Sequence, residues 1–310
     1  MSGPGGAHVR EVRRIDERTY LLHVWSPANE RTLRVGIMVP PPELGPRPTL
    51  YCLDGYQDFS REGEDALASD WYWSGGGHEF FGDKNLNVVF TVDPGPTMYR
   101  DFLVPVPGRG PVRLETFLAV ELPPLVDAAC RGNGTNGLMG VSSGAAAAFM
   151  TAVRHRGRYT TLAGFSGVYD VANAFGAALW SGMWRMKGIE PEWVMGVGLT
   201  DQWLRYDPGL RHNGNLQSLR ETTVYLSAAG GLVPGEPWSR TRWNADPTLF
   251  GGTLEVTSFH ATTRFAHLLS TEGVDVTEDY RLSGTHDWPL WREQLPLAWP
   301  TLARGLGVRG

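Results

Sequence analysis

Cysteine and charge are both scarce in this chain of 310 residues. Its two cysteines are too few for a disulfide framework or a cysteine-rich metal site. Cys52 sits inside an apolar strand pattern, so we expect a buried free thiol there rather than a bridge to Cys130. Charged residues make up 20% of the chain, the net charge is -5, and no basic run is longer than Arg13-Arg14. This composition argues against nucleic acid or an anionic membrane surface as the main partner.

Long apolar runs and cofactor motifs are absent as well. No stretch approaches the roughly 20 apolar residues of a membrane span, and Met1–Gly6 lacks the apolar core of a secretory signal. The sequence has no H-E-x-x-H, no Walker pattern and no G-x-G-x-x-G placed after a strand. We therefore expect no transmembrane segment, no metal and no cofactor. We also expect that the protein either lost a leader before residue 1 or reaches its place of work by another route.

Short apolar segments alternate with helical patterns along most of the chain. Most of these segments are bounded by Gly, Pro or Asp, which is typical of buried strands in a mostly parallel sheet. The alternation favours an α/β fold with helices on both faces of the sheet, as one domain over 1–310 with an N-terminal tail at 1–18. The predicted strands are Tyr20–Trp25, Leu33–Val39, Thr49–Leu53, Leu86–Val92, Gly137–Val141, Thr160–Phe165, Thr223–Ser227 and Val274–Tyr280. The predicted helices are Leu114–Ala129, Gly144–His155, Thr262–Ser270 and Leu290–Leu306.

One stretch, 171–219, interrupts the alternation and is rich in Trp, Gly and Met. The simpler interpretation is a helical insertion that covers the core. The alternative is a lid or an acyl-chain groove over an active site, because exposed aromatic and Met side chains suit a flexible lipid.

A G-x-S-x-G motif, Gly140 to Gly144, is the strongest chemical signal. Alone it is weak, because a chain with 39 glycines contains such a pattern easily by chance. Here it follows an apolar strand and opens an Ala-rich helix, which is the strand–turn–helix arrangement of a nucleophilic serine. Ser142 holds the central position and is the predicted nucleophile. The helix N-terminus supplies partial positive charge, and the amide of Ser143 can donate to an oxyanion.

The general base of such an enzyme comes last in chain order, on a loop after the final strand. His286 fits this position, since it follows the predicted strand Val274–Tyr280 and precedes the C-terminal helix. The acid is expected after the strand Thr223–Ser227, where the loop 228–240 contains one carboxylate, Glu236. Glu236 is therefore the predicted acid, and Asp287 is the fallback. The loop after the third strand should supply the second oxyanion donor, which makes the amide of Tyr56 the candidate.

Several segments together resemble the antigen 85 mycolyltransferases, within the broader esterase D-type group. They are Tyr51 to Gly55, Leu114 to Leu118 with Glu121-Leu122-Pro123, the serine motif, and Gly284 to Trp288. The corynebacterial branch is most similar, through Gly76 to Phe81 and Asn85 to Val89. The resemblance runs from about Leu33 to Leu306 and implies an α/β-hydrolase fold.

The resemblance implies transfer of a mycolic acyl chain between trehalose esters, or to a cell-wall sugar, through an acyl-Ser142 intermediate. It implies a sugar contact at Asp54 and a position for Trp288 near the base. Where the family usually has an arginine that binds trehalose, this chain has Gln57, which lacks the charge and the guanidinium fork. The family works outside the cell, in the envelope, which a removed leader or a phage-borne origin would reconcile with this sequence.

Three functions stay open from the sequence. The first is acyl transfer to a sugar, and the second is hydrolysis of mycolate or other lipid esters by the same three residues. The third is a non-catalytic protein that binds envelope carbohydrate. The expected partners are lipid esters and sugars.

Overall fold

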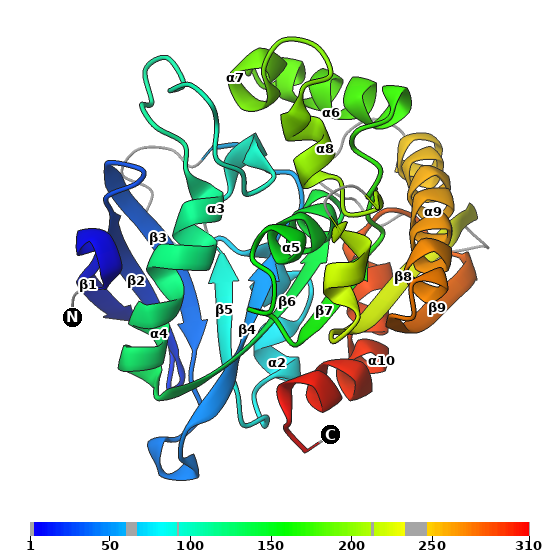
Figure 1. The fold of residues 1–310 in the computed structure, drawn as a ribbon. Helices are drawn as coiled ribbons and strands as arrows, with labels where there is room; N and C mark the ends of the chain where they lie inside the picture. Colours follow the sequence, from blue (N-terminus) through cyan, green and yellow to red (C-terminus); the bar gives the residue numbers. More distant parts are fainter. Residues whose placement is uncertain (1–2, 60–66, 92, 212–213, 233–246, 310) are drawn as a thin grey trace.

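A mixed sheet forms the centre of the computed structural model, which describes residues 3–59, 67–91, 93–211, 214–232 and 247–309 (Figure 1). Within these residues the strands are β1 His8–Arg14, β2 Thr19–Ser26, β3 Arg31–Met38, β4 Arg47–Leu53, β5 Asn87–Thr91, β6 Gly132–Val141, β7 Thr161–Phe165, β8 Thr223–Leu232 and β9 Asp275–Ser283. Their order across the sheet is β1-β2-β3-β5-β4-β6-β7-β8-β9. The first three pairs in this order, β1–β2, β2–β3 and β3–β5, are antiparallel. The remaining pairs, from β5–β4 to β8–β9, are parallel. The predicted mostly parallel α/β sheet is confirmed.

The first strand was missed by the sequence pattern. β1 lies within the segment 1–18 that was expected to be a tail, and it pairs with β2 at the edge of the sheet. Its residues are mostly exposed or half-buried, and it is rich in arginine. An edge strand that faces solvent has no apolar run to reveal it, which is why composition alone suggested a tail. The prediction of an antiparallel hairpin for β2 and β3 is confirmed.

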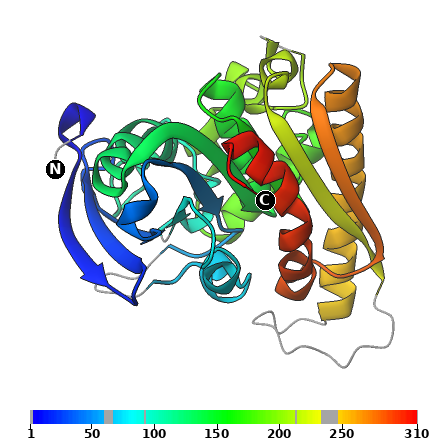
Figure 2. The ribbon, with the colours of Figure 1, turned by 90° about the horizontal axis from the view of Figure 1, so that it is seen from below.

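Helices cover both faces of this sheet (Figure 2). Helices α4, α5 and α9 contribute to one apolar core, and α1, α2 and α10 contribute to the other. The helices are α1 Asp70–Trp73, α2 Gly77–Phe80, α3 Leu114–Thr116, α4 Leu122–Cys130, α5 Ser143–Arg154, α6 Ala174–Met186, α7 Pro191–Met195, α8 Asp201–Tyr206, α9 Pro247–Thr271 and α10 Trp288–Leu306. A π-helical turn, Phe117–Glu121, joins α3 to α4, so the predicted helix 114–129 is three consecutive segments.

The segment 171–219 forms the helices α6, α7 and α8, which lie together at one end of the molecule (Figure 1). Its tryptophans Trp180, Trp184 and Trp203 are buried, as expected of a helical cover. Other large apolar side chains of the segment stay exposed: Phe175, Met186, Val197 and Leu199. The segment therefore both closes part of the core and presents an apolar outer surface.

A buried carboxylate under α5 makes acid stability a testable property of the fold. Glu115 accepts hydrogen bonds from Arg154 at 3.1 Å and pairs with His155 at 3.0 Å. Burial by itself raises the pKa of this carboxyl, but these polar partners outweigh burial and lower the pKa from 4.5 to about 2. The folded pKa is thus depressed, so the carboxylate stabilises the fold above pH 4.5, and this contribution disappears as the pH falls toward 2.

Replacing Glu115 with Gln is expected to lower the free energy of unfolding at pH 7 by about 3 kcal/mol. The same change should flatten the loss of stability between pH 4.5 and pH 2, because the linked proton uptake is gone. Urea unfolding at several pH values measures both effects. The exposed Glu221, changed to Gln, is the matched control. Equal pH slopes for the wild type and Glu115→Gln would contradict the assignment.

Candidate active site

Ser142 stands at the sharp turn between β6 and α5. Its backbone adopts φ 55° and ψ -120°, a conformation that is costly for a residue with a side chain. A Cβ at Gly140 would lie 2.2 Å from the carbonyl oxygen of Gly144, and a Cβ at Gly144 would lie 2.4 Å from that of Leu53. The two glycines of the motif are therefore required by space, and the turn they allow lifts the serine hydroxyl off the end of the strand.

His286 lies against this hydroxyl. It occupies the loop between β9 and α10, and its Nε2 is 2.9 Å from Ser142 Oγ. The structure thus brings together the two residues that the sequence analysis paired. Asp287, the fallback acid, has a different place, because its carboxylate accepts the Trp288 amide at 2.8 Å and caps the N-terminus of α10.

The carboxylate on the far side of His286 is Glu255. Its Oε2 is 2.7 Å from His286 Nδ1, and its side chain is fully buried. Its Oε1 accepts from Ser166 Oγ at 2.8 Å and from the Ala229 amide at 2.7 Å. Ser142, His286 and Glu255 form one hydrogen-bonded line. Glu236, the acid predicted from the sequence, lies outside the described residues. In the described part of the structure, Glu255 is the carboxylate that contacts the His286 imidazole.

Glu255 escaped the sequence analysis because α9 begins 15 residues before the predicted start, at Pro247 rather than Thr262. The first turns of α9 contain the pair Gly251-Gly252, and because glycine is a poor helix former the sequence does not predict a helix there. A signal was nevertheless present. Gly252, Glu255, Ser258 and Thr262 are all buried, and they form a stripe of small and polar residues at helical spacing. A buried acid within such a stripe is rare unless it is paired.

Further side chains hold the Glu255 carboxylate in place. Ser166, which gives Oε1 a hydrogen bond, itself accepts from Trp291 Nε1 at 2.9 Å. The Trp291 ring also meets the His286 ring edge-on at a centroid distance of 4.9 Å. Trp288, expected near the base, packs edge-on against Trp291 at 5.1 Å and so lies one ring further out. The acid and the base are thus held by the same aromatic residue.

The two candidate oxyanion amides flank the nucleophile. Ser143 is the first residue of α5, where the helix dipole places partial positive charge. On the other side, a Cβ added to Gly55 would stand 3.5 Å from Ser142 Cβ, so the loop after β4 passes directly beside the serine. Tyr56 is the next residue of that loop. The role of both amides stays a prediction.

The two residues expected to contact a sugar, Asp54 and Gln57, both have hydrogen-bond partners within the protein. Asp54 is fully buried, and its carboxylate accepts the Trp71 amide at 2.8 Å at the start of α1. Burial and the nearby charge of Asp70 raise its pKa well above its usual range. The Asp54 side chain has no exposed surface in this conformation, and its contact with a sugar stays a prediction. Gln57 is half-buried and donates to Asp70 Oδ2 at 2.9 Å.

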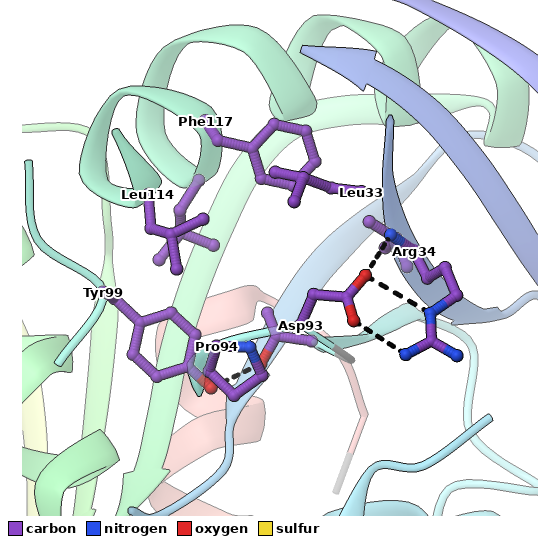
Figure 3. Close-up of a pocket in the computed structure, with 10 residues that line it drawn as sticks. Leu33, Arg34, Asp93, Pro94, Tyr99, Leu114 and Phe117 are labelled. Carbon is purple, nitrogen blue, oxygen red and sulfur yellow. Dashed lines mark hydrogen bonds and ion pairs between the residues drawn. The ribbon is translucent and has the colours of Figure 1, made fainter. Parts of the chain in front are cut away.

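A small cavity lies away from this constellation, beside the ion pair of Arg34 and Asp93 (Figure 3). Leu33, Leu114 and Phe117 give it apolar walls, and its volume is about 20 Å³. That is room for one water molecule at most, so it is no substrate site. Within the described residues, no group of three or more His, Cys, Asp or Glu side chains could hold a metal ion. In the same part of the chain, no helix has the length and apolar character to cross a membrane.

Comparison with known proteins gives a consistent result. A family model described as "Putative esterase" matches residues 26–302. The chain is 27% identical over 269 residues to the diacylglycerol acyltransferase/mycolyltransferase Ag85A of Mycobacterium tuberculosis, covering 84% of this chain and 74% of the relative. The Ag85A of Mycobacterium leprae is 25% identical over 276 residues, with 84% and 76% covered.

Solved structures show the same fold at low sequence identity. Mycobacterium tuberculosis MPT51 (FbpC1) superposes with a TM-score of 0.74 and 21% identity, over 92% of this chain and 97% of that chain. An S-formylglutathione hydrolase from Agrobacterium tumefaciens has a TM-score of 0.69 at 13% identity, with 97% and 100% covered. The α/β-hydrolase arrangement of sheet and helices is therefore confirmed.

Proposed function

The chain belongs to this esterase family, and we propose that within it the chain is a serine acyltransferase that moves a long acyl chain through an acyl-Ser142 intermediate. The esterase or acyltransferase class follows from its relatives. The observation that carries the finer proposal is the hydrogen-bonded line from Glu255 through His286 to Ser142.

In the first step, His286 Nε2 takes the proton of Ser142 Oγ as the oxygen attacks the ester carbonyl. The carbonyl oxygen becomes an oxyanion, which the amides of Tyr56 and Ser143 stabilise by hydrogen bonds. Glu255 keeps the Nδ1 proton in place and stabilises the imidazolium that forms. His286 then returns its proton to the leaving alcohol oxygen as the C–O bond breaks, which leaves an acyl-serine.

In the second step, an acceptor hydroxyl attacks the acyl-serine and gives its proton to His286. A new ester forms, and Ser142 recovers its proton. The relatives' names, diacylglycerol acyltransferase and mycolyltransferase, favour a long acyl chain and a lipid or sugar acceptor for this chain as well. The exposed apolar side chains of the 171–219 segment suit such a chain. A place of action at the cell envelope belongs to the same proposal.

Hydrolysis is the second candidate, and one observation favours it. Gln57, which stands where the resembling family has a sugar-binding arginine, has its amide nitrogen engaged by Asp70. A neutral side chain already held by a neighbour binds a sugar acceptor less strongly than a free guanidinium would. If no acceptor competes, water attacks the acyl-serine by the same route.

Incubation of the purified protein with trehalose monomycolate, with and without added trehalose, separates the candidates. We expect trehalose dimycolate on thin-layer chromatography, and we expect it to disappear in Ser142→Ala. Free mycolic acid alone would instead establish an esterase and would point to Gln57 as the reason. If wild type and variant both yield no product, the mycolate assignment fails, and a binding role or another ester becomes the better explanation.

A further inference from the structure

The loop that carries the Tyr56 amide is attached to the 171–219 segment through the side chain of Tyr56 itself. The Tyr56 hydroxyl donates a hydrogen bond to the backbone carbonyl of Met183, in α6. The tyrosine is half-buried, and burial raises its pKa above the ordinary value, so the hydroxyl remains a donor. The partner is a main-chain atom, so the bond depends on where α6 lies and not on which side chain it carries.

The Met183 carbonyl is available because the last turn of α6 tightens. In a regular helix the amide of Lys187 would bond to Met183, four residues earlier. Here that amide bonds to the Trp184 carbonyl at 2.9 Å, and the amide of Ile189 bonds to the same oxygen at 3.0 Å. The carbonyls at a helix C-terminus need partners from outside the helix. Tyr56 supplies one for Met183.

A second contact joins the same two segments. Lys187, at the C-terminal end of α6, places its Nζ 2.5 Å from Asp58 Oδ1. The same ammonium group is 5.8 Å from the centre of the Tyr56 ring. On its other side the loop passes beside the nucleophile, since a Cβ added to Gly55 would stand 3.5 Å from Ser142 Cβ. Residues 55–58 are thus held between Ser142 and α6.

We propose that Tyr56 is a positioning residue whose hydroxyl fixes its own amide, the oxyanion donor, against α6. The oxyanion hole is then complete only while α6 is docked on the loop. The 171–219 segment and the catalytic centre are coupled through the Tyr56 hydrogen bond and the neighbouring ion pair of Lys187 and Asp58. This inference rests on the proposed function, because the Tyr56 amide has a catalytic task only if Ser142 forms an acyl-enzyme. Small displacements of an oxyanion donor are costly, since its hydrogen bond is formed in the transition state.

Tyr56→Phe removes the hydroxyl and keeps the ring and the amide. With p-nitrophenyl butyrate we expect kcat to fall about tenfold, less than the hundredfold or more for complete loss of a donor, while KM stays within twofold. An alkylboronic acid, which forms a tetrahedral adduct on the serine, should bind about tenfold more weakly to the variant. Tyr72→Phe is the matched control, because it removes a hydroxyl that donates to Asp16 at 2.7 Å.

Four outcomes separate the possibilities. If wild-type protein shows no ester cleavage that depends on Ser142, the proposed function fails. If the wild type is active but Tyr56→Phe keeps kcat and boronate affinity within twofold of it, the positioning role is overturned. Equal losses in Tyr56→Phe and Tyr72→Phe would overturn it too, because they would reflect general destabilisation. A selective loss in Tyr56→Phe supports it.

The contact of Lys187 with Asp58 gives an independent arm should Tyr56→Phe fail to fold. Lys187→Met removes the charge and keeps most of the side-chain length. We expect Lys187→Met to weaken boronate binding several-fold. Because the contacts of Lys187 and Tyr56 hold the same loop, the effects of Lys187→Met and Tyr56→Phe should not add. Wild-type affinity in Lys187→Met, or strict additivity of the two changes, would contradict the shared tether.

Discussion

Ser142→Ala is expected to lower the cleavage of p-nitrophenyl butyrate by about 10⁵-fold or more and to abolish labelling by a fluorophosphonate probe. The reason is that Ser142 Oγ, at the end of β6, lies within hydrogen-bond reach of His286 Nε2, at 2.9 Å. Without this oxygen no acyl-enzyme forms, and the imidazole and the oxyanion amides have nothing to act on. Steady-state kinetics and mass spectrometry of the labelled protein measure the two effects.

The neighbouring serine supplies the control. Ser143 is buried at the first position of α5, and its expected contribution is its backbone amide. Ser143→Ala keeps that amide and should retain activity within a few-fold. Activity that survives in Ser142→Ala but is lost in Ser143→Ala would overturn the assignment of the nucleophile.

A glycine at position 142 adds a test of the strained turn. Ser142→Gly should be as inactive as Ser142→Ala, but its free energy of unfolding should be higher than that of the alanine variant by about 1 kcal/mol. The positive φ of residue 142 costs about 1–3 kcal/mol for any residue with a Cβ. Part of the gain is offset by the greater freedom of glycine in the unfolded chain. Comparison of the two inactive variants by urea unfolding isolates the strain from the chemistry.

Strands and helices could be predicted where the sequence has apolar runs. Elements without such runs could not be predicted. The strands from β2 to β8 contain buried residues, so their apolar side chains stand out between Gly, Pro and Asp. β1 forms an exposed edge, and the charged residues that suit an edge made it look like a tail. The C-terminal parts of β8 and the first turns of α9 were missed because glycines interrupt both.

In the candidate site, the nucleophile and the base could be predicted from the sequence, but the acid could not. Ser142 belongs to a local motif whose glycines can be read directly, and His286 is fixed by its place after the last strand. The acid is harder to predict from the sequence, because its position depends on where α9 packs against β8. In the sequence, Glu236 is the first carboxylate after the predicted strand Thr223–Ser227, whereas Glu255 reaches the imidazole from a helix. Chain order limits the acid to the interval between β8 and His286, but only three-dimensional packing selects one carboxylate within it.

Glu255→Gln is expected to lower kcat about 10⁴-fold with little change in KM. Gln has nearly the same shape, and its carbonyl oxygen can still accept from Ser166 and the Ala229 amide, so the fold should persist. What changes is the imidazole. A carboxylate keeps the proton on His286 Nδ1, whereas the amide NH₂ of Gln can donate to Nδ1 and leave the proton on Nε2. The lone pair that must take the Ser142 proton is then absent, and the positive charge of the imidazolium is no longer compensated.

Glu236→Gln is the decisive comparison, because it makes the same chemical change in the carboxylate chosen from sequence alone. We expect kcat within about threefold of the wild type, far from the loss that the removal of a triad acid causes. The reverse result, an inactive Glu236→Gln and an active Glu255→Gln, would mean that Glu255 is not the acid that acts with His286 and Ser142. Glu255→Asp refines the test. Its carboxylate retains the charge but is shorter by one methylene, so an activity between wild type and Glu255→Gln would show that both the charge and the 2.7 Å contact with His286 contribute.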